Sequence, residues 1–491
     1  MSPGPITDVL FCVADQWRAD ALGVLGTAGV RTPNLDALAA EGVLFANHWC
    51  QASPCGPARA SLLTGTAVST HGQWTNDDAA RPDLATLAET LRSAGVSPIL
   101  VGYTDTPQHP TAAGAGDPAR WSELVDPAFD VAFPFIWQHG FPAWRAVLAE
   151  RGYDVDTDHP FGLYAPDGEP DTDSLAPARY RADDSDVAVL TDAAIEVLDR
   201  RETPSLLHLT WLRPHPPLTP PRPYHRLVDP DEVALPQRPL PVDVEATRHP
   251  YFQLTVPGRS MTEYLQRRCR LDDVGERDDR LIRAAYYGLV AEVDEQFGRL
   301  VAELRRRDRY DTTLIVVTSD HGDALGDHWI YGRRGPFDGH AQVPCIVRDP
   351  RPSADSTRGT MVGELTTNID LLPTICGVLG IDPPGSAEGR SLEPFLDDAP
   401  LPGWRDHVRF DMSFHDHARA AGAATPADSP AGNRFTMVRT ADHRLVRFHE
   451  LPPLLFDLAD DPHETIDRAA DADYRPVLAD LLDLIGGPAG S

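Results

Sequence analysis

Short apolar runs in this sequence end in side chains that can bind a metal ion or an anion. The runs and the polar residues after them are VLFCVA with Asp15, SPILVG with Tyr103 and Asp105, LLHLTWL with Arg213 and His215, and TLIVVTS with Asp320 and His321. Such β-branched runs are typical of strands buried on both faces of a parallel sheet. One polar residue could simply end a strand. Because ligands of open α/β sheets bind beyond the carboxyl ends of the strands, the converging ends predict a ligand site.

The segment CQASPCGPARASLLTG, residues 50–65, carries a second chemical signal. Pro57 suits the first turn of a helix, so we expect Cys55 at a helix N-terminus. That position lowers the pKa of a thiol and favours bound anions. Arg59 follows one turn later on the same face and can bind an oxyanion beside Cys55. A helix start with an incidental cysteine would have the same spacing, so the spacing alone leaves both interpretations open.

Helices alternate with the strands and must help to position these side chains. We predict helices at 33–42, 186–201, 279–307 and 370–380. This alternation predicts an α/β fold with a large, mostly parallel central sheet flanked by helices. Two long irregular stretches, about 105–184 and 214–278, are expected to wall the ligand edge of the sheet. Aromatic residues at 137–144 could line a substrate wall or anchor their stretch, and we favour the anchor.

The pattern changes to short alternating runs from residue 403, followed by a helix at 474–485. Short alternating runs are typical of antiparallel strands with one buried face. We therefore predict an α/β domain over residues 1–402 and a small C-terminal antiparallel α+β subdomain over residues 403–491.

The composition excludes several classes of protein. The 491 residues include 74 acidic and 44 basic side chains, and the net charge of −30 argues against nucleic-acid or anionic-membrane partners. All of the basic residues are Arg, which excludes the usual pyridoxal-phosphate enzymes and Walker-type nucleotide hydrolases. The six cysteines are sparse, and we find neither a signal peptide nor a membrane span. We therefore expect a cytoplasmic protein, whose local arginines still permit a small anionic substrate.

The segment Cys55-Gly-Pro-Ala-Arg59, followed by Leu63-Thr64-Gly65, resembles the signature of the sulfatase family. Further motifs that match this family, in chain order, are ADQWRAD, TPNLDALAAEGVLFANHW, RPHPP, SDHGDALGDH and FDLADDPHE. The resemblance covers nearly the whole chain and implies an alkaline-phosphatase-like catalytic domain over residues 1–402. DQWRAD, GYT, LRPHPP and LPPLLFDL are most similar to the phosphonate monoester hydrolase and phosphodiesterase branch. Choline-sulfatase-like enzymes are the next most similar.

The resemblance implies a covalent nucleophile and a metal ion. A separate formylglycine-generating enzyme would oxidise Cys55 to formylglycine (3-oxoalanine), whose hydrate attacks sulfur or phosphorus. One divalent ion would be held by Asp15, the modified Cys55, Asp320 and His321. Carboxylates with one imidazole suit Ca²⁺, Mg²⁺ or Mn²⁺ rather than a thiolate zinc site. We expect Mn²⁺ or Ca²⁺, and His321, where many members carry Asn, favours Mn²⁺. Gln16 stands where many members carry a further acidic ligand.

The resemblance also implies roles for the side chains around the nucleophile. Arg59 would hold the hydrate, and His215 would protonate the leaving oxygen or contact the substrate anion. Arg333 replaces a family lysine that contacts the sulfate and can help to protonate the leaving group. Since Arg keeps its proton, Arg333 could only bind the anion through its positive charge. The adjacent Arg334 could fill that place instead. His328 would support the site or serve a structural role. Substrate binding would involve Asn76, Tyr103 and Asp105, the last of which stands where we expect Thr.

The expected activity is metal-dependent hydrolysis of sulfate monoesters, phosphonate monoesters or phosphate diesters. Alternatives are a dedicated sulfatase for one small aryl or choline-like ester, and a two-metal phosphatase of related fold. A non-catalytic homologue that binds a metal or an anion is a further alternative, against which the intact signature residues argue. The expected partners are a small anionic ester substrate and the formylglycine-generating enzyme. We also expect a homo-oligomer. The related branch tends to form tetramers, but we expect a dimer at least as strongly as a tetramer for this chain.

Overall fold

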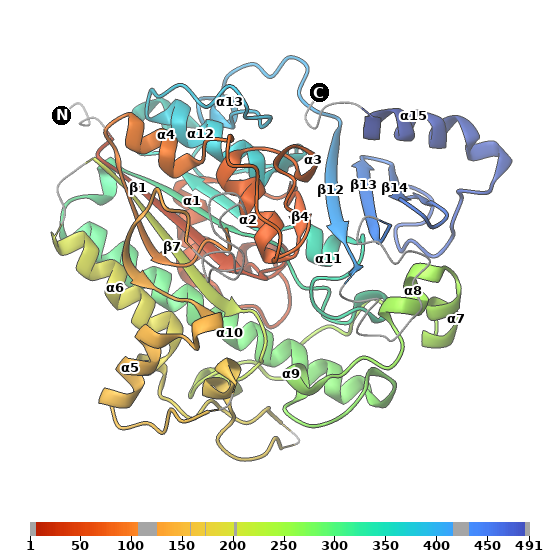
Figure 1. Ribbon diagram of the computed structural model, residues 1–491, viewed down its shortest axis with the longest axis horizontal. Coiled ribbons are helices and arrows are strands. Elements are labelled where there is room, and N and C mark those ends of the chain that lie inside the picture. The colour runs from red at the N-terminus through yellow and green to blue at the C-terminus, as the bar shows by residue number, and fades with distance from the viewer. Residues whose placement is uncertain are drawn as a thin grey trace.

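The computed structural model describes residues 6–106, 125–157, 159–171, 173–200, 204–415 and 432–486. Its centre is an eight-stranded sheet in the order β10-β2-β9-β8-β1-β7-β5-β6. Figure 1 labels β1 and β7 of this sheet. The strands predicted from the apolar runs are neighbours in its middle, namely β8 (Thr313–Ser319), β1 (Asp8–Asp15), β7 (Ser205–Pro214) and β5 (Ser97–Gly102). These four strands are mutually parallel. The predicted α/β fold with a mostly parallel central sheet is confirmed.

The other strands of this sheet lie toward its edges. They are β9 (Cys345–Arg348), β2 (Val43–Phe45), β10 (Thr360–Val362) and β6 (Asp130–Pro134). β9 is antiparallel to both β8 and β2, whereas β10 pairs in parallel with β2 and β6 in parallel with β5. Both antiparallel pairs therefore involve β9, which lies beside β8 on the side of the sheet away from β5 and β6.

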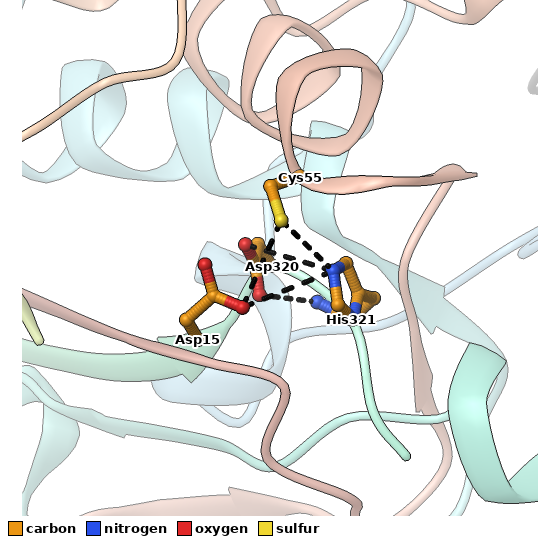
Figure 2. Close-up of side chains that lie close together, drawn as sticks. All are labelled: Asp15, Cys55, Asp320 and His321. Carbon is orange, nitrogen blue, oxygen red and sulfur yellow. Dashed lines mark hydrogen bonds and ion pairs between the residues drawn. The ribbon is translucent and has the colours of Figure 1, made fainter. Parts of the chain in front are cut away.

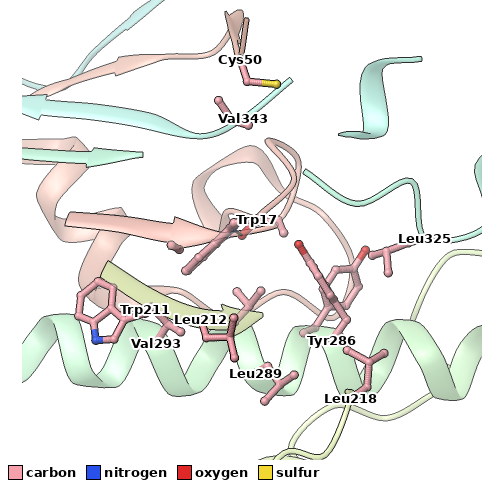
Figure 3. Close-up of a cluster of buried hydrophobic side chains, with 14 of the residues drawn as sticks. Trp17, Cys50, Trp211, Leu212, Leu218, Tyr286, Leu289, Val293, Leu325 and Val343 are labelled. Carbon is pink, nitrogen blue, oxygen red and sulfur yellow. Dashed lines mark hydrogen bonds between the residues drawn. The ribbon is translucent and has the colours of Figure 1, made fainter. Parts of the chain in front are cut away.

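The side chains of β1 alternate between two hydrophobic cores, because successive residues of a strand face opposite sides of the sheet. One core, which includes Leu10 and Cys12, holds α1 (Pro33–Glu41), α6 (Asp186–Arg200) and α10 (Glu276–Arg306). The other core holds α2 (Cys55–Thr64), α4 (Leu87–Ser93) and α12 (Leu371–Val378). In Figure 3, α10 lies beside the Trp211 and Leu212 side chains of β7. No helix of the described ranges is long and apolar enough to cross a membrane.

A second sheet, in the order β15-β14-β13-β12-β4, is formed mainly by the C-terminal part of the chain. β12 (His407–Ser413), β13 (Arg434–Thr440), β14 (His443–Phe448) and β15 (Leu454–Asp457) pair antiparallel, as predicted. α15 (Arg475–Gly486) packs on β13 and β14. β12 also pairs in parallel with β4 (Ala52–Ser53). The C-terminal sheet thereby adjoins the segment that leads directly into Cys55.

The two stretches expected to be irregular contain short elements of their own. The first holds β6 and α5 (Pro142–Glu150), while its residues 107–124, 158 and 172 lie outside the described residues. The second holds α7 (Val242–Thr247), α8 (Pro250–Thr255) and α9 (Thr262–Leu265). β6 escaped prediction because it is a short edge strand that buries little of its surface. The remaining short elements are α3 (Val68–His71), α11 (Asp338–Ala341), α13 (Glu393–Leu396), β3 (His48–Trp49) and β11 (Thr366–Thr367).

Gly102 ends β5 with a φ of +120°, immediately before Tyr103. A Cβ atom added there would lie 2.7 Å from the backbone oxygen of Thr210 and even closer to its side chain. We expect Gly102→Ala to lower the free energy of unfolding by about 2–4 kcal/mol, because strain and a backbone clash add. Gly95→Ala is the control, since Gly95 has a φ of +84° with nothing within 4 Å. Strain alone should cost it about 1 kcal/mol. If urea unfolding showed that both variants lose the same free energy of unfolding, the close contact between residue 102 and Thr210 would be contradicted.

Candidate active site

Asp15, Cys55, Asp320 and His321 meet at the carboxyl edge of the central sheet (Figure 2). Each offers one ligand atom, and these atoms all lie within 4.8 Å of one another. Asp15 ends β1, Asp320 and His321 follow the neighbouring β8, and Cys55 is the first residue of α2. All four side chains are buried. The structure therefore brings together the residues that the sequence suggested as metal ligands.

The imidazole of His321 is oriented toward this cluster. Its Nδ1 lies 3.1 Å from the backbone oxygen of Gly322, and Nε2 lies 3.4 Å from Cys55 Sγ. We assign the proton to Nδ1, which donates to Gly322 and leaves the lone pair of Nε2 directed at the cluster. Burial lowers the pKa of His321 to about 4. The imidazole is therefore neutral, the form in which histidine binds a metal.

The buried carboxylates of Asp15 and Asp320 share one guanidinium. Arg59 Nε lies 3.1 Å from Asp320 Oδ2, and Arg59 Nη2 lies 3.2 Å from Asp15 Oδ2. Tyr103 Oη also donates to Asp15 Oδ2, at 2.7 Å. One cation facing two carboxylates leaves a negative charge uncompensated, and burial together with Asp15 raises the pKa of Asp320 to about 7. A divalent cation would compensate this charge, so the donor set fits a hard metal ion.

Arg333 connects Cys55 with His215. Its Nη1 lies 3.0 Å from Cys55 Sγ and 2.9 Å from His215 Nε2. His215 Nδ1 lies 2.5 Å from the backbone oxygen of Pro216, so we assign a tautomer in which Nδ1 donates there and Nε2 accepts from Arg333. Burial, reinforced by Arg333, lowers the pKa of His215. Of the two adjacent arginines, the geometry favours Arg333 for the position of the family lysine.

The thiol of Cys55 behaves differently from the sequence prediction. Burial raises its pKa, and Asp15 and Asp320 add to the shift, although Arg333 opposes it. The prediction that the helix N-terminus lowers this pKa is wrong, because desolvation and two carboxylates outweigh a helix dipole. A thiol at this place stays protonated unless a cation offsets the carboxylates.

A cavity of about 270 Å³ opens above the buried cluster. Its wall includes Asp15, Cys55, Asn76, Tyr103, Asp105, His215 and Arg333, while Arg59, Asp320 and His321 lie in the cluster beneath. Asn76 Oδ1 accepts a hydrogen bond from the backbone N–H of Gly56 at 2.9 Å. Asp105 is buried and has no described partner for Oδ1. Burial, with the charge of Asp15, raises the pKa of Asp105 to about 7. All predicted site residues thus lie in one place.

Further parts of the cavity wall were not recognised in the sequence. They are the aromatic residues Phe135 and Phe161, and the residues Arg259, Glu263 and Tyr264, whereas the sequence had already drawn attention to Trp137, Phe141 and Arg334, which line the cavity as well. The segment 137–144 turns out to serve both purposes, because Trp137 lines the cavity while Trp144 is fully buried. These residues lie mainly on loops and short helices, so no periodic pattern marks them. The only sequence signal was the length of the two stretches that carry them.

Two further residues, Gln16 and His328, make side-chain contacts outside the metal-ligand cluster, although Gln16 also lines the cavity. Gln16 Nε2 donates to Asp323 Oδ2 at 2.5 Å. His328 stacks on Phe337, with ring centroids 3.8 Å apart, and its Nδ1 lies 3.3 Å from a carboxylate oxygen of Glu245. The contacts of His328 fit the structural role rather than support of the site.

Comparisons with known proteins agree with this geometry. The profile of the family Sulfatase matches residues 7–381, and the profile N-sulphoglucosamine sulphohydrolase, C-terminal, matches residues 326–486. The chain belongs to the sulfatase family. It is similar to the phosphonate monoester hydrolase of Agrobacterium radiobacter, with a TM-score of 0.89 and 33% identity over 98% of this chain and 95% of that chain.

The similarity extends to two further proteins. The phosphonate monoester hydrolase SpPMH from Silicibacter pomeroyi has a TM-score of 0.87 and 34% identity, covering 98% of this chain and 94% of that chain. The multifunctional alkaline phosphatase superfamily protein PehA of Trinickia caryophylli is 32% identical over 96% of this chain and 93% of its own length. The family resemblance is confirmed, and the chain is a hydrolase of sulfuric or phosphoric esters.

Proposed function

We propose that the chain hydrolyses sulfate monoesters, phosphonate monoesters or phosphate diesters through formylglycine made from Cys55, with one divalent metal ion. The position of Cys55 carries this proposal. Its Sγ lies 3.8 Å from Asp15 Oδ1 and 3.4 Å from His321 Nε2, while Arg333 reaches it from the cavity side. A reactive group on residue 55 would therefore contact the metal ligands and the substrate at once. Maturation would require a formylglycine-generating enzyme.

The chain's own residues would support this chemistry in distinct ways. Asp15, Asp320, His321 and the modified residue 55 would hold the ion, which we expect to be Mn²⁺ or Ca²⁺. When present, the ion and the formylglycine hydrate supply a Lewis acid and an activated hydroxyl nucleophile. Arg59 Nη1 is a buried donor with no partner in the described part of the chain, so it is available to hold residue 55 in place.

The cavity side would bind the tetrahedral anion of the substrate. Burial opposes the charge of Arg333, but its neighbours Cys55 and Asp15 outweigh burial and raise its pKa. Arg333 therefore keeps its proton and binds the substrate oxygens through its positive charge. Asn76 and Tyr103 line the same space. Asp105 stands where we expected Thr, and its raised pKa would allow a protonated carboxyl group to donate a hydrogen bond as a hydroxyl would.

His215 is proposed to protonate the leaving oxygen. Substrate would displace Arg333 from Nε2 and bring an anion beside it, so that Nε2 takes up a proton from water and then passes it to the leaving oxygen. We expect His215→Ala to lower kcat/KM about 10²–10³-fold for esters of poor leaving groups, and about tenfold or less for 4-nitrophenyl esters, which need little proton donation. A leaving-group series measures this difference. His463→Ala, at an exposed histidine, controls for the loss of an imidazole. Equal losses across the series would show that His215 binds the substrate anion instead.

A matched substrate panel tests the proposed function. The enzyme, produced with a formylglycine-generating enzyme, is assayed on 4-nitrophenyl sulfate, 4-nitrophenyl phenylphosphonate and bis(4-nitrophenyl) phosphate. The similarity to phosphonate monoester hydrolases favours the phosphonate monoester as the best of these. A preference for sulfate above about 10²-fold would instead support the dedicated sulfatase. Failure of the modified enzyme on all of them would overturn the proposal.

A further inference from the structure

Two arginines in the cavity wall have no anionic partner in the part of the chain that the structure describes. Arg259 lies in the stretch before α9, and Arg334 follows Arg333, and both line the cavity above Cys55. Among the described residues, none forms an ion pair with either guanidinium. The chain has 74 acidic and 44 basic side chains, so carboxylates to pair with arginine are abundant. Two guanidinium groups left unpaired in the substrate cavity therefore call for an explanation.

Arg259 is held in place by neighbours that also shape the reacting centre. Its Nη1 donates to the backbone oxygen of Tyr331, and its guanidinium lies 5.5 Å from the ring centroid of Tyr264. Asp323 accepts hydrogen bonds from Tyr264 Oη at 2.9 Å and from the backbone N–H of Gly332 at 2.6 Å. A Cβ atom added at Gly332 would lie 3.2 Å from Arg259 Nη2. Arg259 is thus fixed against the loop that carries Arg333 and Arg334.

The cations crowd one another in the free cavity. Burial lowers the pKa of Arg334 to about 9, with Arg259 as the next largest cause and Arg333 adding to the shift. Arg333 already contacts Cys55 and His215, so it belongs to the reacting centre. Arg259 and Arg334 have no such contacts. An anion bound between them would relieve their repulsion, and a guanidinium pairs with a carboxylate through two parallel hydrogen bonds.

We propose that Arg259 and Arg334 form a subsite for a carboxylate on the leaving group of the substrate. This inference rests on the proposed function, which puts the reacting sulfur or phosphorus at residue 55. The substrate then carries two anionic groups, one at the reacting centre and one on the alcohol or phenol that is released. A cavity of about 270 Å³ limits the arm between them to a small one.

Paired esters test the subsite. The formylglycine-containing enzyme is assayed on the sulfate and phenylphosphonate esters of 4-hydroxybenzoate and of 4-hydroxybenzamide, which differ by one carboxylate charge. We expect the carboxylate-to-amide ratio of kcat/KM to be highest at low salt and to fall as ionic strength rises. Arg259→Gln and Arg334→Gln should each lower the carboxylate-to-amide ratio about tenfold. Comparing this ratio between variants cancels the intrinsic reactivities of the leaving groups.

Arg299→Gln is the matched control, because it removes the same charge from an exposed pair with Asp192 on the surface. Its carboxylate-to-amide ratio should equal that of the formylglycine-containing enzyme without substitutions. A carboxylate-to-amide ratio that does not fall with rising ionic strength in the enzyme without substitutions overturns the subsite, whatever the variants do. So does a ratio that neither substitution changes. Failure to hydrolyse even the 4-nitrophenyl esters would instead overturn the proposed function, so the two failures can be told apart.

Discussion

Replacing Cys55 by alanine is expected to lower kcat/KM for ester hydrolysis by about 10⁴-fold or more, because the covalent nucleophile is lost. The variant should still fold, since it removes only a small buried side chain at the start of α2. The truncation of one small buried side chain lowers the free energy of unfolding by far less than the total free energy of unfolding of a domain. Initial rates on 4-nitrophenyl esters, with thermal unfolding of the same samples, measure both effects.

Cys269→Ala is the matched control for this substitution. Cys269 is a partly exposed thiol in the stretch 214–278 and does not line the cavity. Its replacement should leave hydrolysis unchanged, which would show that the loss belongs to the position and not to thiol chemistry in general. If Cys55→Ala kept more than about one hundredth of the activity, the nucleophile would have to lie elsewhere.

Removal of the divalent ion is the second change with a large expected effect. Asp15, Asp320 and His321 present two carboxylates and one neutral imidazole to the same buried point, beside a single compensating Arg59. Chelation should therefore lower kcat about 10³-fold or more, and one equivalent of Mn²⁺ or Ca²⁺ per chain should restore it. Asp320→Asn should reproduce the loss, because it removes a ligand and its charge together.

Metal analysis and an exposed control complete this test. Asp355→Asn, at an aspartate outside the cavity, should keep both the metal content and the activity. A content of two ions per active chain would favour the two-metal phosphatase over the single-metal mechanism. Full activity after every ion has been removed would contradict a metal-dependent reaction altogether.

The sequence predicted the parts of the site that depend on regular structure. Asp15 and Asp320 follow continuous apolar runs, and parallel strands bring their carboxyl ends to one edge by geometry alone. The helix that starts at Cys55 was equally visible, because Pro57 and the spacing to Arg59 are local signals. The family motif then connected these positions to a chemistry that spacing alone had left open.

Other features depend on tertiary packing and could not be predicted from local patterns. Arg259 and the aromatic residues of the cavity wall lie on loops whose paths are set by distant contacts. The pKa of Cys55 is raised because Asp15 and Asp320, far away in the sequence, are buried beside it. The choice between Arg333 and Arg334 likewise required the geometry, since adjacent residues share every sequence signal.

The oxidation state of residue 55 tests the central claim most directly. Digestion at arginine releases the peptide from Thr32 to Arg59, which contains Cys55 and Cys50. In protein produced with a formylglycine-generating enzyme, its mass should fall by the replacement of a thiol with an aldehyde, and fragmentation should place the change at Cys55. An intact thiol at Cys55, from a host that modifies other sulfatases, would contradict the proposed nucleophile.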